Sequence, residues 1–399
     1  MPRFELDGEI WEIVQEAQQL HLDASGKQTT RKFVSPDHAA VQYAKLIAEK
    51  EAAGWKQVVG APVSRGAQSD EPREPGLEQH IIASLDDRDA YAVYGDWYQS
   101  RQHPRGELIA LQLAEATRGE DRKLHDVVVK HLARYKADLL GPLARHVAPN
   151  GQSPLVWRNG FIQGLIFTGD EEHPAEIIRE VLSHPSGRFL TSLELQLHDG
   201  SAIRDALLAL GGARATMRDV HVRTGATLDG LGVFEHMPRL RTLSIATLAE
   251  IALAPRQIRE LAKLPASLEA LHVRLDGADR NEWDDLAPLF ARDDLDIRKI
   301  SMRVPSLIDP ILTAIAEGPF APRVESLDFA LTDPDEGMRA FIAHRERFVK
   351  LRTVTVSLDR ITLEARNALK TFKKVVDVRW DDLPEQIGYD EDHFDDVQE

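Results

Sequence analysis

The stretch from Leu240 to Met302 decides the fold, because one six-residue pattern occurs in it three times. The pattern reads LRTLSI at 240–245, LEALHV at 268–273 and IRKISM at 297–302, with apolar residues at its first, fourth and sixth positions. Alternating apolar residues are typical of a β-strand with one buried face. The copies begin 28 and 29 residues apart, so the sequence predicts a structure built from repeated units.

Further copies extend the pattern in both directions. Nine copies begin at Ile162, Leu190, Met217, Leu240, Leu268, Ile297, Val324, Leu351 and Val375, separated by 28, 27, 23, 28, 29, 27, 27 and 24 residues. A helix-like stretch, such as DPILTAIAEGPF at 309–320, follows each copy. Each unit is therefore predicted to be a strand, a loop and a helix, and it buries its apolar face only by stacking on its neighbours.

This register resembles the leucine-rich-repeat family across residues 151–382. The resemblance implies an α/β solenoid: a curved parallel sheet with helices on its convex side. Nine strands about 4.8 Å apart give a concave sheet on the order of 40 Å across, large enough to hold a protein. The Asn that bonds the loops of this family is replaced here by residues including His198, Asp276, Thr332 and Asp359, which indicates a divergent subtype.

A helical segment precedes the repeats, at residues 77–150. Apolar residues recur in it at helical spacing, Pro104 is expected to open its middle helix, and Gly141-Pro142 to close its last. Asp96-Trp97 and the later PRGELI at 104–109 resemble the hallmark of a helical domain that accompanies repeats in bacterial proteins. The resemblance implies no catalytic role, and we expect this domain to cap the apolar end of the solenoid.

Residues 1–58 are expected to form a small domain, joined to the helical segment by a linker at 59–76. IWEI at 10–13, GKQTTRKF at 26–33 and AAVQYAKLIAEKEAAGW at 39–55 resemble a WGR domain, a module also present in poly(ADP-ribose) polymerases. We expect strands near 11–14 and 31–34 and a helix between Ser35 and Gly54. LHLDAS stands where the family has Trp-Gly-Arg, so no DNA-contacting residues carry over.

Composition excludes several classes of protein. The chain has 399 residues, a formal charge of −16 and no cysteine, which removes disulfides, thiolate nucleophiles and Cys-ligated zinc. We find no apolar run long enough for a membrane helix and no signal-peptide pattern, so we expect a cytoplasmic protein without membrane contact. Nine acids and no Lys or Arg lie in the last nineteen residues, and an acidic tail is predicted at 383–399.

No motif for catalysis or nucleotide binding is found, so we expect neither an enzyme nor a cofactor. The acidic clusters Glu171-Glu172 and Asp293-Asp294-Asp296 are interpreted as solvated loop charges, because adjacent carboxylates point apart. Scattered histidines give no metal-site spacing, and His131 is interpreted as a buried core residue. Trp97, in register with Val93 and Tyr94, is interpreted in the same way.

One set of residues is predicted to bind a partner, because side chains that alternate with buried strand positions must face the concave side. These residues are His221, Arg223, His272, Arg274, Ser301 and Arg303, with the acids Glu194 and Asp328 further out. Such a basic centre suits an acidic protein, since Arg binds carboxylates in a bidentate manner. We therefore predict a non-catalytic adaptor. The alternative is that the WGR-like module contacts DNA or RNA while the solenoid recruits a protein.

Overall fold

The structure is a computed structural model of the chain. It describes residues 71–377 except 120, 148–152, 170–172, 214, 227, 248–254, 276–282, 305–306, 330–334, 357–361 and 370–374, and it describes parts of 3–57. The expected acidic tail and most of the expected linker lie outside these residues. The chain divides into two compact units, Met1–Gln68 and Ser69–Glu399.

The first unit contains an antiparallel sheet in the order β4-β3-β2-β1-β5. Its strands are β1 (Arg3–Leu6), β2 (Glu9–Glu16), β3 (Gln19–Ala24), β4 (Lys27–Lys32) and β5 (Lys56–Gln57). The strand expected at 11–14 lies within β2, and the strand expected near 31–34 is the end of β4. Most of the helix expected between Ser35 and Gly54 lies outside the described residues.

The second unit contains a sheet whose ten described strands lie side by side in chain order. They are β6 (Leu155–Arg158), β7 (Phe161–Gly169), β8 (Ser192–Leu197), β9 (Asp219–Thr224), β10 (Thr242–Thr247), β11 (Ala270–Leu275), β12 (Lys299–Arg303), β13 (Ser326–Asp328), β14 (Thr353–Val356) and β15 (Val375–Asp377). All neighbouring pairs from β7 to β15 are parallel, whereas β6 pairs antiparallel with β7. Each of the nine predicted strand segments thus overlaps a strand, although seven of them begin two residues before the strand does.

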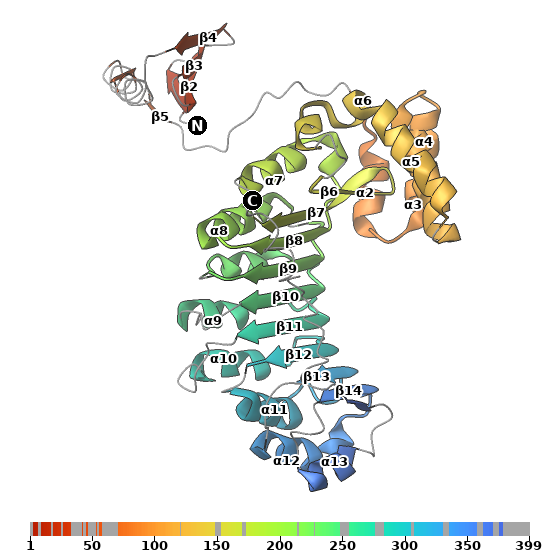
Figure 1. The fold of residues 1–399 in the computed structure, drawn as a ribbon, viewed down its shortest axis with the longest axis vertical. Coiled ribbons are helices and arrows are strands. Elements are labelled where there is room, and N and C mark those ends of the chain that lie inside the picture. The colour runs from red at the N-terminus through yellow and green to blue at the C-terminus, as the bar shows by residue number, and fades with distance from the viewer. Residues whose placement is uncertain are drawn as a thin grey trace, which may run out of the picture. The chain divides into compact units, whose positions relative to one another are not determined.

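A helical layer follows one side of these strands (Figure 1). Its helices are α7 (Pro174–Ser183), α8 (Gly200–Ala209), α9 (Pro255–Leu261), α10 (Trp283–Phe290), α11 (Ile308–Glu317), α12 (Asp335–Ala343) and α13 (Leu363–Leu369). Between β9 and β10 the described element is a 3-10 helix, η4 (Leu231–His236). This unit also has the shortest spacing, 23 residues, which leaves less chain for an α-helix.

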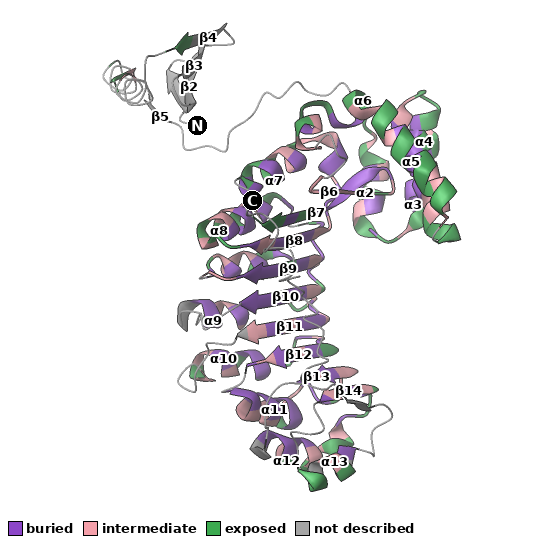
Figure 2. Cartoon of the chain, viewed as in Figure 1, coloured by how far each residue is buried: buried purple, intermediate pink, exposed green. Residues whose placement is uncertain are grey.

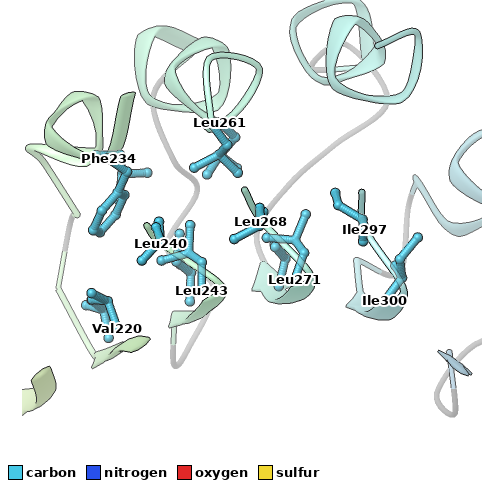
Figure 3. Close-up of a cluster of buried hydrophobic side chains, with 14 of the residues drawn as sticks. Val220, Phe234, Leu240, Leu243, Leu261, Leu268, Leu271, Ile297 and Ile300 are labelled. Carbon is cyan, nitrogen blue, oxygen red and sulfur yellow. The ribbon is translucent and has the colours of Figure 1, made fainter. Parts of the chain in front are cut away.

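The core lies between the sheet and the helical layer. Val220, Leu243, Leu271 and Ile300 point from successive strands toward Phe234, Leu261 and their neighbours (Figure 3). Each of these side chains is at most 3% exposed. They belong to one continuous apolar cluster that runs from Leu140 to Leu369, so burial of apolar surface joins the units between these two residues.

Side chains also bond one unit to the next. Arg292, Arg323 and Arg347 each donate to a backbone carbonyl oxygen 30 residues earlier, at 3.1, 2.7 and 2.6 Å. Arg347 also bonds the carbonyl of Gly318, the C-cap of α11, and a cation there complements the helix dipole. At the strand ends, the buried Thr247 hydroxyl donates to the carbonyl of Arg274. Side chains other than Asn thus bond these turns.

A group of helices covers the β6–β7 end of the sheet. It comprises α2 (Pro75–Ala83), α3 (Arg88–Gln99), α4 (Pro104–Arg118), α5 (Arg122–Arg134), α6 (Lys136–Leu140) and the 3-10 helix η1 (Gly141–His146). Pro104 opens α4 and Gly141 ends α6, as predicted. Tyr91 and Tyr94 pack with Phe161 and Phe189 of the repeats, all fully buried. Exposed residues gather on the outer sides of α4 and α5 (Figure 2).

Arg105 joins these helices to the repeats. Its Nε and Nη2 atoms donate to the two carboxylate oxygens of Glu71, each at 2.7 Å, and its Nη2 and Nη1 atoms donate to Ser186 Oγ and the carbonyl of Gly160. The Arg105 and Glu71 side chains are 0% and 3% exposed. Arg188 lies 3.6 Å from Glu71. The PRGELI motif therefore supplies a buried arginine that holds the two parts together.

Asn159 and Gly160 form the turn between β6 and β7. Both have positive φ, 50° and 80°, which is typical of a type I′ hairpin turn. A Cβ on Gly160 would lie 2.2 Å from Ile109 of α4. Glycine is thus required by the backbone conformation and by the approach of the helix.

Candidate functional site

The side chains of β8 to β13 that point away from the helical layer form the candidate site, named here the polar face. Strand register places them in two rows. The first row is Glu194, His221, Ser244, His272, Ser301 and Asp328, and the second is Gln196, Arg223, Ala246, Arg274 and Arg303. All six residues predicted from the sequence thus lie in these two rows, on strands β9, β11 and β12.

The six predicted residues differ in exposure. His221 is exposed, and His272, Arg274, Ser301 and Arg303 are half-buried. Arg223 is only 5% exposed, so its position on this side of the sheet does not leave its side chain open to solvent. A guanidinium in such surroundings makes stronger charge-assisted hydrogen bonds than one in water.

Carboxylates limit the basic part of the polar face at both ends. Glu194 is level with His221 on the preceding strand, and Asp328 is level with Ser301 on the following strand. Both positions agree with the prediction. Three strand spacings separate β9 from β12, so the basic part is about 14 Å wide.

Three residues of the two rows were absent from the sequence-based prediction, Gln196, Ser244 and Ala246, and so was Lys299, two positions before Ser301. The same alternation that predicted the other residues points to them, since each is two positions from a predicted or neighbouring outward residue. The small side chains of β10 carry no charge that would point to a binding role. One of them, Ser244, lines a recess on this face.

A recess of about 310 Å³ lies on the polar face over β8, β9 and β10. Side chains and backbone of Glu194, Leu195, Gln196, His221, Val222, Arg223 and Ser244 line it. Gln196 Nε2 donates to Glu194 Oε1 at 2.5 Å, which holds the carboxylate at one wall. The recess thus presents a basic side on β9 and an acidic side on β8.

Burial is the main cause that holds the pKa of His272 below its ordinary value, and charge repulsion from the neighbouring His221 and Lys299 lowers this pKa further. A bound anion would reverse the effect of those charges, since an opposite charge favours the protonated imidazole. The polar face is therefore expected to bind anions more tightly as the pH falls.

The other residues singled out in the sequence lie elsewhere. His131 is 7% exposed and bonds the carbonyl of Pro104 through Nε2 at 2.9 Å, so the prediction of a core histidine is confirmed. Trp97 packs partly buried against Tyr94, and Arg101 lies 3.9 Å above its ring. Asp294 and Asp296 pair with Arg292 and Arg298 at 2.5 Å each. Glu171-Glu172 lies outside the described residues.

The described residues contain neither a metal-binding cluster nor a membrane-spanning helix. Within the described part of the chain, no three His, Cys, Asp or Glu side chains gather closely enough to hold a metal ion. Every helix in the same part is too short or too polar to cross a lipid bilayer.

Comparison with known proteins adds little to the geometry. No protein-family model matches the chain, and no curated protein matches it. Among solved structures, the crystal structure of a Bacteroides fragilis protein is similar at 14% identity and a TM-score of 0.37, covering 94% of this chain and 95% of that one. These values are too low to carry an argument about fold or function.

Proposed function

We propose that the chain is a leucine-rich-repeat solenoid protein that holds an acidic protein partner on its polar face, as a non-catalytic adaptor in the cytoplasm. The repeat family is supported by the regular spacing of 23 to 29 residues and by nine parallel strands in chain order. On this proposal the polar face is the concave side of the solenoid, the surface on which stacked repeats offer the most contact to a partner.

One observation carries the proposed function: the basic side chains of three strands, β9, β11 and β12, are gathered on one face. Arg223, Arg274 and Arg303 lie in one row, and His221 and His272 in the next. The chain as a whole is acidic, with a formal charge of −16. A local basic surface on an acidic protein favours a partner with a matching acidic segment, because complementary charge guides association and selects against other partners.

The N-terminal parts have supporting roles in this proposal. Residues 1–58 are a WGR-like domain, and residues 77–150 are the companion domain that covers the first end of the solenoid. The second role is supported by the packing of α3 against Phe161 and Phe189, because an end repeat without a cover would expose apolar surface.

The test is affinity purification of the full-length protein from its host cells, followed by mass spectrometry. Replacing Arg223, Arg274 and Arg303 together with Ala should remove the partner from the recovered proteins. The matched control replaces three exposed arginines of α4 and α5 with Ala, Arg118, Arg122 and Arg134. That variant has the same net charge and should recover the partner fully.

Two results would contradict the proposal. Equal recovery by both triple variants would show that the polar face does not bind the partner. Loss of the partner after nuclease treatment would show that a nucleic acid mediates recovery, which is the alternative implied by the WGR resemblance. In that case a shift of labelled DNA or RNA by the protein should weaken steeply as salt is raised.

A further inference from the structure

The small side chains of β10 are the starting point. Ser244 lies level with His221 on one side and His272 on the other. Ala246 lies level with Arg223 and Arg274 in the same way. Strand β10 therefore leaves room on the polar face between two strands that each carry a histidine and an arginine.

The recess over β8, β9 and β10 extends to Ser244, one of these two small side chains. Its volume of about 310 Å³ is at the lower end of the range for small-ligand sites, so it suits one side chain better than a large cofactor. His221 and Arg223 line one side. Because Arg223 is 5% exposed, a carboxylate bound to it would exchange bulk water for a paired charge in low-dielectric surroundings.

The carboxylates at both ends of the polar face limit the negative charge of a ligand that can bind there. Glu194 lines the recess beside His221, and Asp328 follows Ser301 on the next strand. A nucleic-acid backbone carries regularly spaced phosphates, so some of them would lie over these carboxylates. A protein segment with one or two acidic side chains avoids that repulsion, and the geometry favours it over a polyanion.

We propose that the recess is an anchor pocket for a single acidic side chain, Asp or Glu, of the partner. Its carboxylate is bound by the Arg223 guanidinium and by the His221 imidazole, and Glu194 excludes a second acidic group from the same space. This inference rests on the proposed function, since it names the chemical group by which the partner is recognised on the polar face.

A direct test uses a small probe and the full-length protein. N-acetylglutamate methylamide and its glutamine counterpart differ only in charge at the side-chain terminus, and saturation-transfer NMR measures the binding of each. The glutamate probe should bind, at least about tenfold more tightly than the glutamine probe, because the amide cannot form the ion pair. Equal binding of the two probes, or no binding of either, would overturn the proposal.

Three variants locate the binding. Ser244→Leu fills the recess and should abolish binding of the glutamate probe, whereas Thr355→Leu, at the same level on β14, should not change it. His221→Ala removes an exposed side chain that packing does not need and should weaken binding. Undiminished binding by Ser244→Leu and His221→Ala would place the probe elsewhere and refute the assignment. Circular dichroism verifies that each variant is folded.

Two further measurements separate this inference from the proposed function. A labelled single-stranded DNA that competes with the glutamate probe and binds more tightly than an acidic peptide would identify a nucleic-acid site and overturn the anchor pocket. In affinity purification, loss of the native partner with the triple arginine variant but not with Ser244→Leu would leave the adaptor function standing and eliminate the anchor pocket alone.

Discussion

Replacing Arg105 with Met tests the buried joint between the helices and the repeats. The variant keeps a long apolar side chain but removes a bidentate ion pair whose two members are 0% and 3% exposed. It leaves the Glu71 carboxylate buried with a more distant cation, Arg188, at 3.6 Å. Removing one partner of a buried pair costs ~3–5 kcal/mol, so we expect a loss of that size in the free energy of unfolding, measured by urea denaturation at about pH 7.

The pH dependence of this loss identifies its cause. Burial raises the pKa of Glu71, but the charge and hydrogen bonds of Arg105, with the Tyr98 hydroxyl and the charge of Arg188, hold it below its ordinary value. The stability from this carboxylate is therefore present above the ordinary pKa and is lost as the pH falls through the lowered one. Without Arg105, burial dominates and the pKa rises, so the variant's deficit should shrink toward about pH 5.

A double variant provides the control. Arg105→Met combined with Glu71→Leu removes both charges, and it should recover most of the lost stability, because an apolar pair of similar volume is tolerated at such sites. A loss that is the same at every pH, together with no recovery in the double variant, would refute this reasoning. The damage would then come from packing and from the bonds to Gly160 and Ser186.

Three further predictions concern stability. Gly160→Ala should lower the free energy of unfolding, measured by urea denaturation, by ~2–4 kcal/mol, because its φ is +80° and the new Cβ would lie 2.2 Å from Ile109. The control Gly119→Ala, with φ +74° and open space around it, should lower it by only ~1–2 kcal/mol. Leu243→Ala, at a fully buried position, should cost ~2–5 kcal/mol in the same measurement, and a smaller loss would mean that the core can close around the cavity. Burial, and then the charge of Arg105, lower the pKa of His184 to about 4. As the pH falls from about 6.5 to about 4, the unfolded chain binds a proton at this histidine before the folded chain does, so the free energy of unfolding should decrease. His184→Gln should flatten that part of the pH profile.

Much of the repeat architecture was predictable because one period governs it. The apolar positions of LRTLSI and its eight counterparts located nine strands, since alternation has one simple structural cause. The first apolar position of seven segments lies two residues before the strand. Strand β6 was missed although Asn159-Gly160 is a strong hairpin signal. Strand β6 pairs antiparallel with β7, the first strand of the repeats. It does not follow the repeat period, so the period does not predict it. The sequence also did not predict that η4 is a 3-10 helix, because its unit differs from the others mainly in length.

The candidate site was predictable in outline but not in detail. Alternation placed His221 and Arg274 on the same face, because strand side chains alternate regardless of the neighbours. The burial of Arg223 and the recess beside it depend on which residues of neighbouring strands are level with one another. That register follows from loop lengths and packing across units. Similarly, nothing local in PRGELI reveals that Arg105 bonds residues 34, 55 and 81 positions away.

The equal sequence separation between the donor and the acceptor has an evolutionary consequence for Arg292, Arg323 and Arg347. Each donates to a carbonyl 30 residues earlier, and the acceptor is backbone, which every residue type supplies. If a whole unit were duplicated or deleted, the guanidinium after the junction would still meet an equivalent oxygen. The number of units, and with it the length of the surface offered to other molecules, can thus change without compensating substitutions at the joints.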